Sequence, residues 1–229
     1  MIIDGKIGFV GSQNICSDYK TWQLKQIDWI DSQLSVENPG TRQLQSIFLE
    51  DWEFTTGEQI SDPAYFPDTA PIGSSYMQAL PTGPDEYDQS FEKILMTMIH
   101  SAEKRVTIGT PYFVPTPAVA LSLEAAVLRG VQVDLLVPEY SDQWWVDAAA
   151  RSWFYDLLRG GVNIYLCTNK FLHAKEVTID EKMALIGSAN MDERSFRLNF
   201  ECSALIYDTR LTEELLTSFD KLASESRKL

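Results

Sequence analysis

Six residues between positions 173 and 190 have types and spacings that would let them act on one reacting group: His173, Lys175, Asp180, Gly187, Ser188 and Asn190. Side chains two residues apart on a strand share one face, so His173 and Lys175 point the same way. After the turn at Asp180, a glycine lets the returning backbone come close, and the hydroxyl and amide that follow can join the same pocket. Together these groups suit a phosphodiester: the ammonium neutralises nonbridging oxygens, the hydroxyl and amide donate hydrogen bonds, and the imidazole acts as nucleophile or as acid and base.

This set of side chains needs no metal or other cofactor, because the lysine supplies the positive charge. The sequence holds two histidines and no CxxC pair, so a zinc site is not expected. The plain alternative is a hydrogen-bonded structural histidine at position 173, with a surface ion pair between Lys175 and Asp180.

The beginning of the chain repeats the later part of this pattern. Residues 3–14 align without a gap with residues 179–190 at a constant offset of 176, and Ile, Asp, Lys, Gly, Ser and Asn are shared. The first copy supplies Asp4, Ser12 and Asn14, which correspond to Asp180, Ser188 and Asn190. A protein that builds one site from two copies carries His and Lys in both, so the missing pair is expected at positions −3 and −1, just before Met1.

The second half of the chain alternates strands with helices, which predicts an α/β layered fold. We expect helices over 89–102, 118–129 and 144–159 and from Thr212 onward, and strands over 105–110, 131–137, 162–166 and 201–207. Two short strands that meet at Asp180 and Glu181 make the β-sheet mixed, with helices flanking it. Trp144 and Trp145 open the third helix, and two interpretations of them stay open: contact with lipid, and packing against the protein.

The first half is less regular. A half-buried strand is expected over 29–36, and Thr41 is the expected N-cap of a helix that runs through Trp52. Residues 57–88 are rich in Pro, Gly, Ser and Asp, which indicates a linker or a long loop. We therefore expect a remnant of a first domain over 1–60, a linker over 61–88 and a complete second domain over 89–229.

Composition narrows the possible partners. The net charge of −14 repels phosphate backbones, which argues against nonspecific nucleic-acid binding and broad adsorption to anionic membranes but permits a local basic pocket. No apolar run approaches the roughly 20 residues of a membrane span, and the first residues do not resemble a signal peptide. The three cysteines, Cys16, Cys167 and Cys202, are expected to be reduced and mostly buried.

The motif that begins at His173 is similar to that of a known group of proteins. His173-x-Lys175-x4-Asp180-x6-Gly187-Ser188-x-Asn190 resembles the HKD motif of the phospholipase D superfamily. Residues 47–52, 110–115 and 194–201 resemble segments in the C-terminal part of bacterial cardiolipin synthases. The resemblance covers essentially the whole chain and implies a phospholipase D-like layered fold, complete in its C-terminal domain and truncated in its N-terminal domain.

In that superfamily two motifs form one site. The resemblance implies that the histidine of one motif attacks phosphorus to form a phosphohistidine, while the other, here His173, serves as the acid and base for the alcohol. It also implies that Glu201 contacts the far nitrogen of His173, and that Asp31 does the same for the absent first histidine. Lys175 and Asp180 complete the catalytic group, Ser188, Asn190, Ser12 and Asn14 bind the substrate phosphate, and Asp4 and Asp31 support them.

The implied reaction transfers a phosphatidyl group between two phosphatidylglycerol molecules and yields cardiolipin and glycerol, with no cofactor. The implied partners are anionic phospholipid, above all phosphatidylglycerol, and the membrane surface. The expected location of the complete protein is the cytoplasmic face of the cell membrane, with no membrane span in this chain. Nucleic acid is not an expected partner, and the oligomeric state is left open.

Several alternatives stay open. With water in place of the acceptor alcohol, the same site is a phospholipase D-type hydrolase. A homodimeric phosphodiesterase or nuclease would take one motif from each chain. Because the first-copy His and Lys are absent, the chain by itself is expected to have little or no transferase activity, and a non-catalytic fragment that binds phospholipid headgroups is a further reading.

Overall fold

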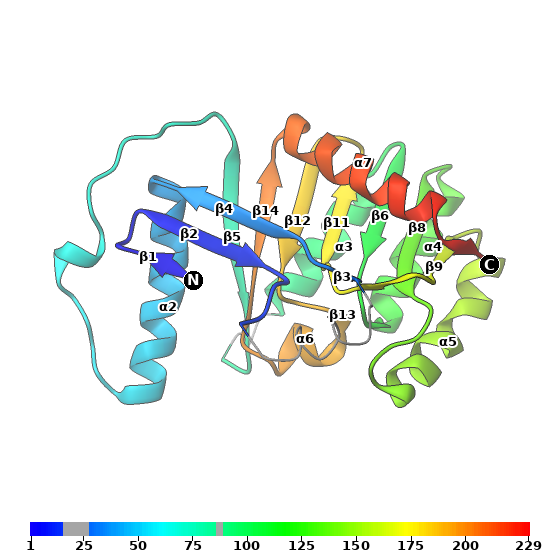
Figure 1. Cartoon of the computed structure of the whole chain (residues 1–229), viewed down its shortest axis with the longest axis horizontal. Helices are drawn as coiled ribbons and strands as arrows, with labels where there is room; N and C mark the ends of the chain where they lie inside the picture. Colours follow the sequence, from blue (N-terminus) through cyan, green and yellow to red (C-terminus); the bar gives the residue numbers. More distant parts are fainter. Residues whose placement is uncertain (16–27, 86–88) are drawn as a thin grey trace.

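The computed structural model describes residues 1–15, 28–85 and 89–229, and its largest feature is one eight-stranded sheet with helices on both faces (Figure 1). In spatial order its strands are β15 (Arg227–Lys228), β9 (Asn163–Cys167), β8 (Gln132–Pro138), β6 (Arg105–Gly109), β11 (Glu176–Ile179), β12 (Met183–Gly187), β14 (Glu201–Tyr207) and β5 (Tyr76–Thr82). Strands β6, β8 and β9 are parallel to one another and the other neighbours are antiparallel, so the sheet is mixed, as predicted.

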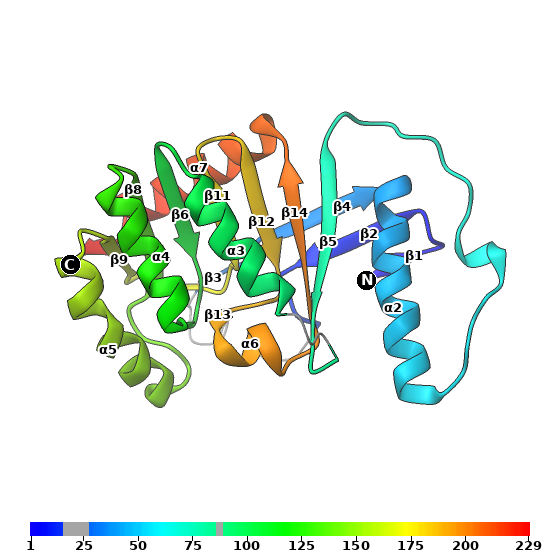
Figure 2. The ribbon, with the colours of Figure 1, turned by 180° about the vertical axis from the view of Figure 1, so that it is seen from behind.

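Helices bury the two faces of this sheet. α3 (Ser90–Ser101) and α4 (Pro117–Leu128) lie side by side on one face, and α7 (Thr209–Ser224) crosses the other (Figures 1 and 2). Apolar side chains of α3, α4, β6 and β8 form the main core, in which Leu95, Leu123 and Ile108 are completely buried. The predicted helices are confirmed, including α5 (Trp144–Arg159). The last helix begins before Thr212, because the Asp208 side chain caps it.

The first half adds a smaller sheet that shares a core with the larger one. β1 (Ile2–Ile3), β2 (Ile7–Gly11) and β4 (Gln33–Glu37) are antiparallel, and α2 (Pro39–Thr56) follows them. Val10, Val36 and Leu44 of this unit pack with Ile186 and Ile206 of strands β12 and β14. The two halves therefore share apolar contacts. The division into domains over 1–60 and 89–229 stays a prediction.

The sequence repeat corresponds to a structural repeat of three strands and a helix. Hairpins β1–β2 and β11–β12 pair in the same register when the offset of 176 residues is applied. The pairs β2–β4 and β12–β14 also share their register, with an offset of 170 residues between β4 and β14. The change of offset explains why the sequence alone displayed only the hairpin.

Two expectations for residues 29–41 are wrong. The single strand is split into β3 (Asp28–Ile30) and β4, because Asp31 and Ser32 between them leave the ladder and bond to the Ser12 hydroxyl. Thr41 does not cap the helix, which begins at Pro39. Its buried hydroxyl instead donates to the carbonyl oxygen of Val36 and ties the helix to strand β4.

The predicted linker over 61–88 is wrong in its last part, since residues 76–82 form strand β5 at the edge of the main sheet. The prolines that suggested a linker include Pro81, which lies opposite Cys202 in the ladder. Proline is tolerated in an edge strand, where a missing backbone N–H leaves no inner neighbour unpaired.

Cys167 is buried and Cys202 half-buried, and both are free thiols, as predicted, whereas Cys16 lies outside the described residues. None of the described helices is long and apolar enough to cross a bilayer. Within the described ranges, no three His, Cys, Asp or Glu side chains are grouped so as to hold a metal ion.

Candidate active site

The segment from His173 to Lys175 lies where the parallel strands β6 and β8 end, at the lower edge of the sheet in Figures 1 and 2. Strand β10 (Lys170–Leu172) stops just before it and β11 begins just after it, so the continuous strand expected here is interrupted. Residues 173–175 therefore lie between the two strands. We call this side of the molecule the catalytic edge.

A carboxylate from the first half orients the imidazole of His173. Strand β3 pairs in parallel with β10, and the His173 amide continues this pairing by donating to the carbonyl oxygen of Ile30 at 2.8 Å. Asp31 and His173 therefore meet just past the ends of their strands, with 2.7 Å between Asp31 Oδ1 and His173 Nδ1. The Ser12 hydroxyl donates to the same Oδ1 at 2.6 Å, which fixes the carboxylate in turn.

Lys175 bonds to the other nitrogen of the same imidazole. Its Nζ lies 2.9 Å from His173 Nε2 and donates to the His173 carbonyl oxygen at 2.8 Å. An ammonium group only donates, so Nε2 accepts and Nδ1 carries the proton that is donated to Asp31. In this arrangement the Nε2 lone pair points toward Lys175 at the catalytic edge.

Burial sets the charge balance of this group. Lys175 is buried, which lowers its pKa to about 8, against the opposing effect of Asp31, Glu201 and more distant carboxylates. Burial likewise raises the pKa of Glu201, although bonds from Ser188 and Asn199 oppose the rise. The nearby carboxylates do not fully offset the burial of the Lys175 ammonium, and an anionic phosphate would stabilise its charge further.

Ser188 and Asn190 follow the returning strand β12, whose last residues lie opposite the start of β11. Ser188 exchanges bonds with residue 202: its amide donates to the Cys202 carbonyl oxygen at 3.1 Å, and its hydroxyl accepts from the Cys202 amide at 3.0 Å. The side-chain oxygen of Asn190 is buried and has no hydrogen-bond partner among the described residues. A buried polar atom costs free energy when it is not hydrogen-bonded.

The first copy of the repeat reproduces the Ser188 geometry at Ser12. The Ser12 amide donates to the Ser32 carbonyl oxygen at 2.9 Å, and the Ser12 hydroxyl accepts from the Ser32 amide at 3.0 Å. Asp31 and Glu201 each precede the residue that bonds to the serine, so they are structural counterparts. Asn14, in contrast to Asn190, is exposed.

The expected pairing of Glu201 with His173 is wrong, because Asp31 occupies that place. The sequence prediction assigned each carboxylate to the histidine of its own copy. The parallel pairing of β3 with β10 instead carries the carboxylate of the first copy to the histidine of the second. Glu201 lies near Ser188 and accepts a bond from Asn199 at 3.3 Å.

Asp180 is also misplaced in the predicted catalytic group. It lies in the turn between β11 and β12, at the end of β11 opposite Lys175. Its carboxylate accepts bonds of 2.7–2.9 Å from the amides of Glu103, Lys104 and Arg105. Burial acts to raise its pKa, but these bonds hold it below its ordinary value. Asp4 occupies the matching turn position, with φ of 52° against 58°, so both aspartates shape turns.

Two contributors to the site were missed by sequence reasoning. The Trp29 ring lies 4.9 Å from the His173 ring and forms one wall of the imidazole site. Asp142 follows the end of β8, accepts a bond from the Tyr112 hydroxyl at 2.6 Å, and acts electrostatically on Lys175. The position of Asp142 just after a parallel strand was the available signal, since such strand ends meet at one edge.

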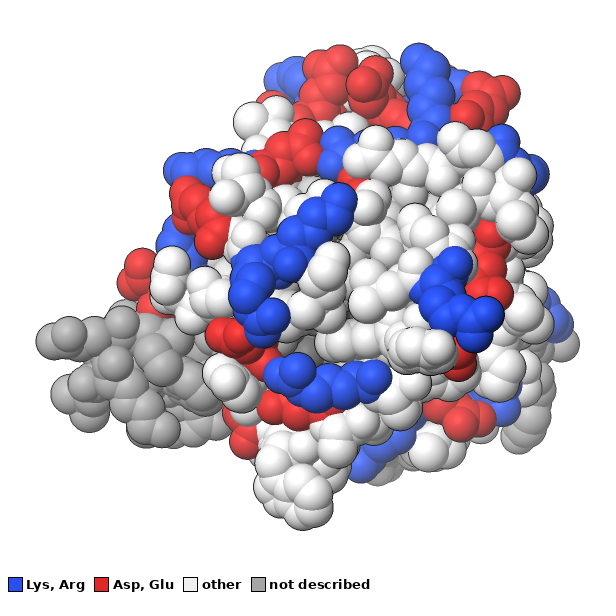
Figure 3. Space-filling model, turned by 90° about the vertical axis from the view of Figure 1, so that its right-hand side faces the viewer, with Lys and Arg blue, Asp and Glu red and all other residues white. Residues whose placement is uncertain are grey.

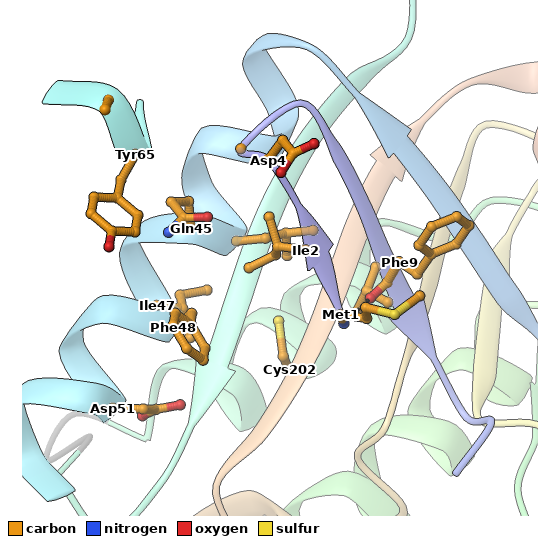
Figure 4. A pocket seen from close by; sticks show the side chains of 14 residues that line it. Met1, Ile2, Asp4, Phe9, Gln45, Ile47, Phe48, Asp51, Tyr65 and Cys202 are labelled. Atoms are coloured by element: carbon orange, nitrogen blue, oxygen red, sulfur yellow. Dashed lines mark hydrogen bonds between the residues drawn. The ribbon is translucent and has the colours of Figure 1, made fainter. Parts of the chain in front are cut away.

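Two hollows adjoin the first-half helix. One of about 210 Å³ is lined by Ser188, Glu201, Phe200 and acidic residues including Asp51. A larger, mostly apolar one of about 790 Å³ lies between the β1–β2 hairpin and α2, where side chains of α2 face Ile2 and Cys202 (Figure 4). His173 and Lys175 do not line the larger hollow, so its size does not make it the catalytic pocket.

The family described as "Cardiolipin synthase, PLD-like domain" matches residues 95–223, a span that contains His173, Lys175 and Asn190. The chain belongs to this family. The cardiolipin synthase of Geobacillus thermodenitrificans is 39% identical over 221 residues, which are 96% of this chain and 44% of that protein. Cardiolipin synthase 2 of Bacillus anthracis is 39% identical over 100% of this chain and 45% of its own length. The chain thus spans somewhat under half the length of these cardiolipin synthases.

Solved structures support the same fold. Phosphatidylserine synthase of Haemophilus influenzae Rd KW20 superposes with a TM-score of 0.69 over 98% of this chain and 61% of that one, at 15% identity. The phospholipase D family member Nuc from Salmonella typhimurium gives a TM-score of 0.58 over 68% of this chain and 99% of its own, at 20% identity. The predicted phospholipase D-like fold is therefore confirmed.

Proposed function

We propose that this chain supplies one half of a phosphatidyltransferase site that converts two phosphatidylglycerol molecules into cardiolipin and glycerol. The observation that supports this most directly is the Asp31–His173–Lys175 chain of hydrogen bonds, which presents Nε2 on the catalytic edge. The family membership supports the choice of substrate. In this proposal Ser188 and Asn190 hold the phosphate, while Ser12 holds Asp31.

The proposed roles follow from the bonding. A bound phosphate draws the Lys175 ammonium away from Nε2, and His173 can then take up a proton, which Asp31 stabilises. A second imidazole, bonded to Glu201 as His173 is to Asp31, attacks phosphorus: the P–N bond forms, the bond to the glycerol oxygen breaks, and His173 gives that oxygen its proton. The hydroxyl of a second phosphatidylglycerol then gives its proton to His173 and displaces the histidine, which restores both groups.

The proposed partner is anionic phospholipid at a membrane surface, on the cytoplasmic face of the cell membrane. The net charge of −14 disfavours nucleic acid, whose polyanionic backbone would be repelled over many phosphates. A single headgroup phosphate is compatible with that charge, because Lys175 offers a local cation.

A chimera tests the proposal. Residues 1–229 would replace the matching 45% of Bacillus anthracis cardiolipin synthase 2, so that a complete first half precedes them. With phosphatidylglycerol vesicles, we expect cardiolipin and glycerol in equal amounts by mass spectrometry, and no cardiolipin from residues 1–229 alone.

His100, the other histidine of this chain, provides the matched control. H173A should abolish turnover by the chimera, whereas H100A should not, because His100 is exposed on α3 and its Nδ1 bonds to the Met96 carbonyl oxygen of the same helix. Phosphatidic acid without cardiolipin would replace the proposal with hydrolysis. Full activity of the H173A chimera would refute the assigned role of His173.

A further inference from the structure

Three large aromatic side chains stand out from the protein at the start of α5. Tyr140 is 71%, Trp144 76% and Trp145 56% exposed. The two tryptophan rings meet edge to face, with 5.9 Å between their centroids. Both rings are mostly exposed, so neither tryptophan belongs to the protein core.

These aromatic residues lie beside the catalytic edge. They follow β8, whose last residues end at that edge, and they flank Asp142, whose charge acts on Lys175. In Figures 1 and 2 the first turn of α5 reaches the lower side of the molecule together with α6 (Glu193–Arg197). Leu198, just after α6, is a further exposed apolar residue at 62%.

The segment that carries the aromatic residues is held firmly. The Ser141 amide donates to Asp147 at 2.8 Å, and Arg151 donates to the Glu139 carbonyl oxygen at 2.8 Å. The rings therefore project from an ordered support, which reduces the entropy lost when they bind.

Figure 3 looks onto the side that carries α5 and the C-terminus, where a broad uncharged area is bordered by Lys and Arg side chains and also by Asp and Glu side chains. Arg151 and Arg159 of α5 are exposed. Exposed Trp and Tyr together with scattered basic residues are typical of surfaces that lie in the interfacial layer of a bilayer.

We propose that Tyr140, Trp144 and Trp145 insert into the interfacial layer of a phospholipid bilayer and hold the catalytic edge against it. This inference rests on the proposed function, because a substrate whose headgroup lies in the bilayer must reach His173 from the membrane. A protein partner seated on the same rings would separate the catalytic edge from its substrate, so the bilayer is the occupant that fits.

Vesicle binding tests this surface independently of turnover. Residues 1–229 and the variant W144S/W145S would be sedimented with vesicles of phosphatidylcholine and phosphatidylglycerol, and Y155S would serve as control. Tyr155 is an aromatic residue of similar exposure, at 67%, but lies three turns further along α5. We expect W144S/W145S to lower the partition coefficient at least about tenfold and Y155S to leave it within about twofold.

A second readout uses lipids brominated on their acyl chains. Tryptophan fluorescence of the unmodified chain should be quenched by these vesicles, and W144S/W145S should remove most of the quenching. Circular dichroism would establish that the variants are folded; if the double variant unfolds, the W144S and W145S single variants should each lose part of the binding. Unchanged binding and quenching in folded variants, or no binding by the unmodified chain, would overturn the proposal.

The outcome separates this inference from the proposed function. In the chimera, W144S/W145S should lose turnover on vesicles but keep it on short-chain phosphatidylglycerol below its micelle concentration. Equal loss on both substrates would overturn the docking role. A chimera that binds vesicles through the two tryptophans and makes no cardiolipin would refute the proposed reaction and leave the docking surface standing.

Discussion

The polar groups at the two ends of strand β11 have different environments. At the far end, the Asp180 carboxylate is satisfied by three backbone amides. At the catalytic edge, Lys175 and Glu176 are buried with shifted pKa values, and Asn190 keeps an unpartnered oxygen as far as the described residues show. One end of the strand holds the fold together, and the other holds groups ready for a ligand at a cost in stability.

The largest expected effect comes from the carboxylate behind the imidazole. Asp31→Asn in the chimera should lower cardiolipin formation on the order of 10²–10⁴-fold, because the amide neither orients His173 as a base nor stabilises its cation. Initial rates on phosphatidylglycerol vesicles would measure this loss. Asp28→Asn, at the exposed start of the preceding strand β3, should have little effect. Equal losses in both variants would place the effect in the strand and not in the His173 contact.

At the Asp180 end of β11, loss of the carboxylate should lower the stability of the fold. Asp180→Ala should lower the free energy of unfolding by about 3 kcal/mol, because three amides lose a charged acceptor. Asp4→Ala, at the matching exposed turn position, should cost only about 1 kcal/mol, from the positive φ. Urea denaturation followed by circular dichroism compares the two.

The Asp180 effect has a defined pH dependence. Its pKa is lowered in the folded protein, so its stabilisation is present above the ordinary aspartate pKa and is lost as pH falls through the lower folded value. The difference in stability from Asp180→Asn should therefore shrink below about pH 3.9. A difference that stays constant into acid would contradict a role for the ionised carboxylate.

A buried group at the catalytic edge should respond in the opposite direction. Burial raises the pKa of Glu176 to about 7, so the folded protein loses stability as pH rises from the unfolded value of 4.5 to about 7. Glu176→Gln should therefore stabilise the protein by roughly 2 kcal/mol at pH 8 and hardly at all at pH 4. Thermal unfolding at the two pH values measures this. Glu181, exposed in the turn at the other end of β11, should show no such gain when changed to Gln.

The smallest effect is a shift in the pH profile. Because Lys175 loses its proton near pH 8, the activity of the chimera should fall as pH rises through about 8. Lys175→Arg keeps its charge and should remove that alkaline fall, whatever its absolute rate. An identical fall in both proteins would assign the titration to another group.

The sequence predicted much of the fold and of the site. Repeating motifs and strand–helix alternation located the mixed sheet, the β11–β12 hairpin and the Ser12–Ser188 equivalence, since these depend on local pattern. The sequence did not predict contacts between distant segments. These are the β3–β10 pairing, which brings Asp31 to His173, and the edge strand β5, which contains a proline. Asp180 was misplaced because a motif records spacing, whereas a strand separates its two ends.

The bond between Asp31 and His173 joins residues that are 142 positions apart. At typical synthesis rates the ribosome needs roughly 7–30 s to add that much chain. During this interval the short strand β3 waits without β10, and contacts of such sequence separation form late in folding. The imidazole is thus oriented among the last events of maturation, which keeps an incompletely made chain from presenting a competent base.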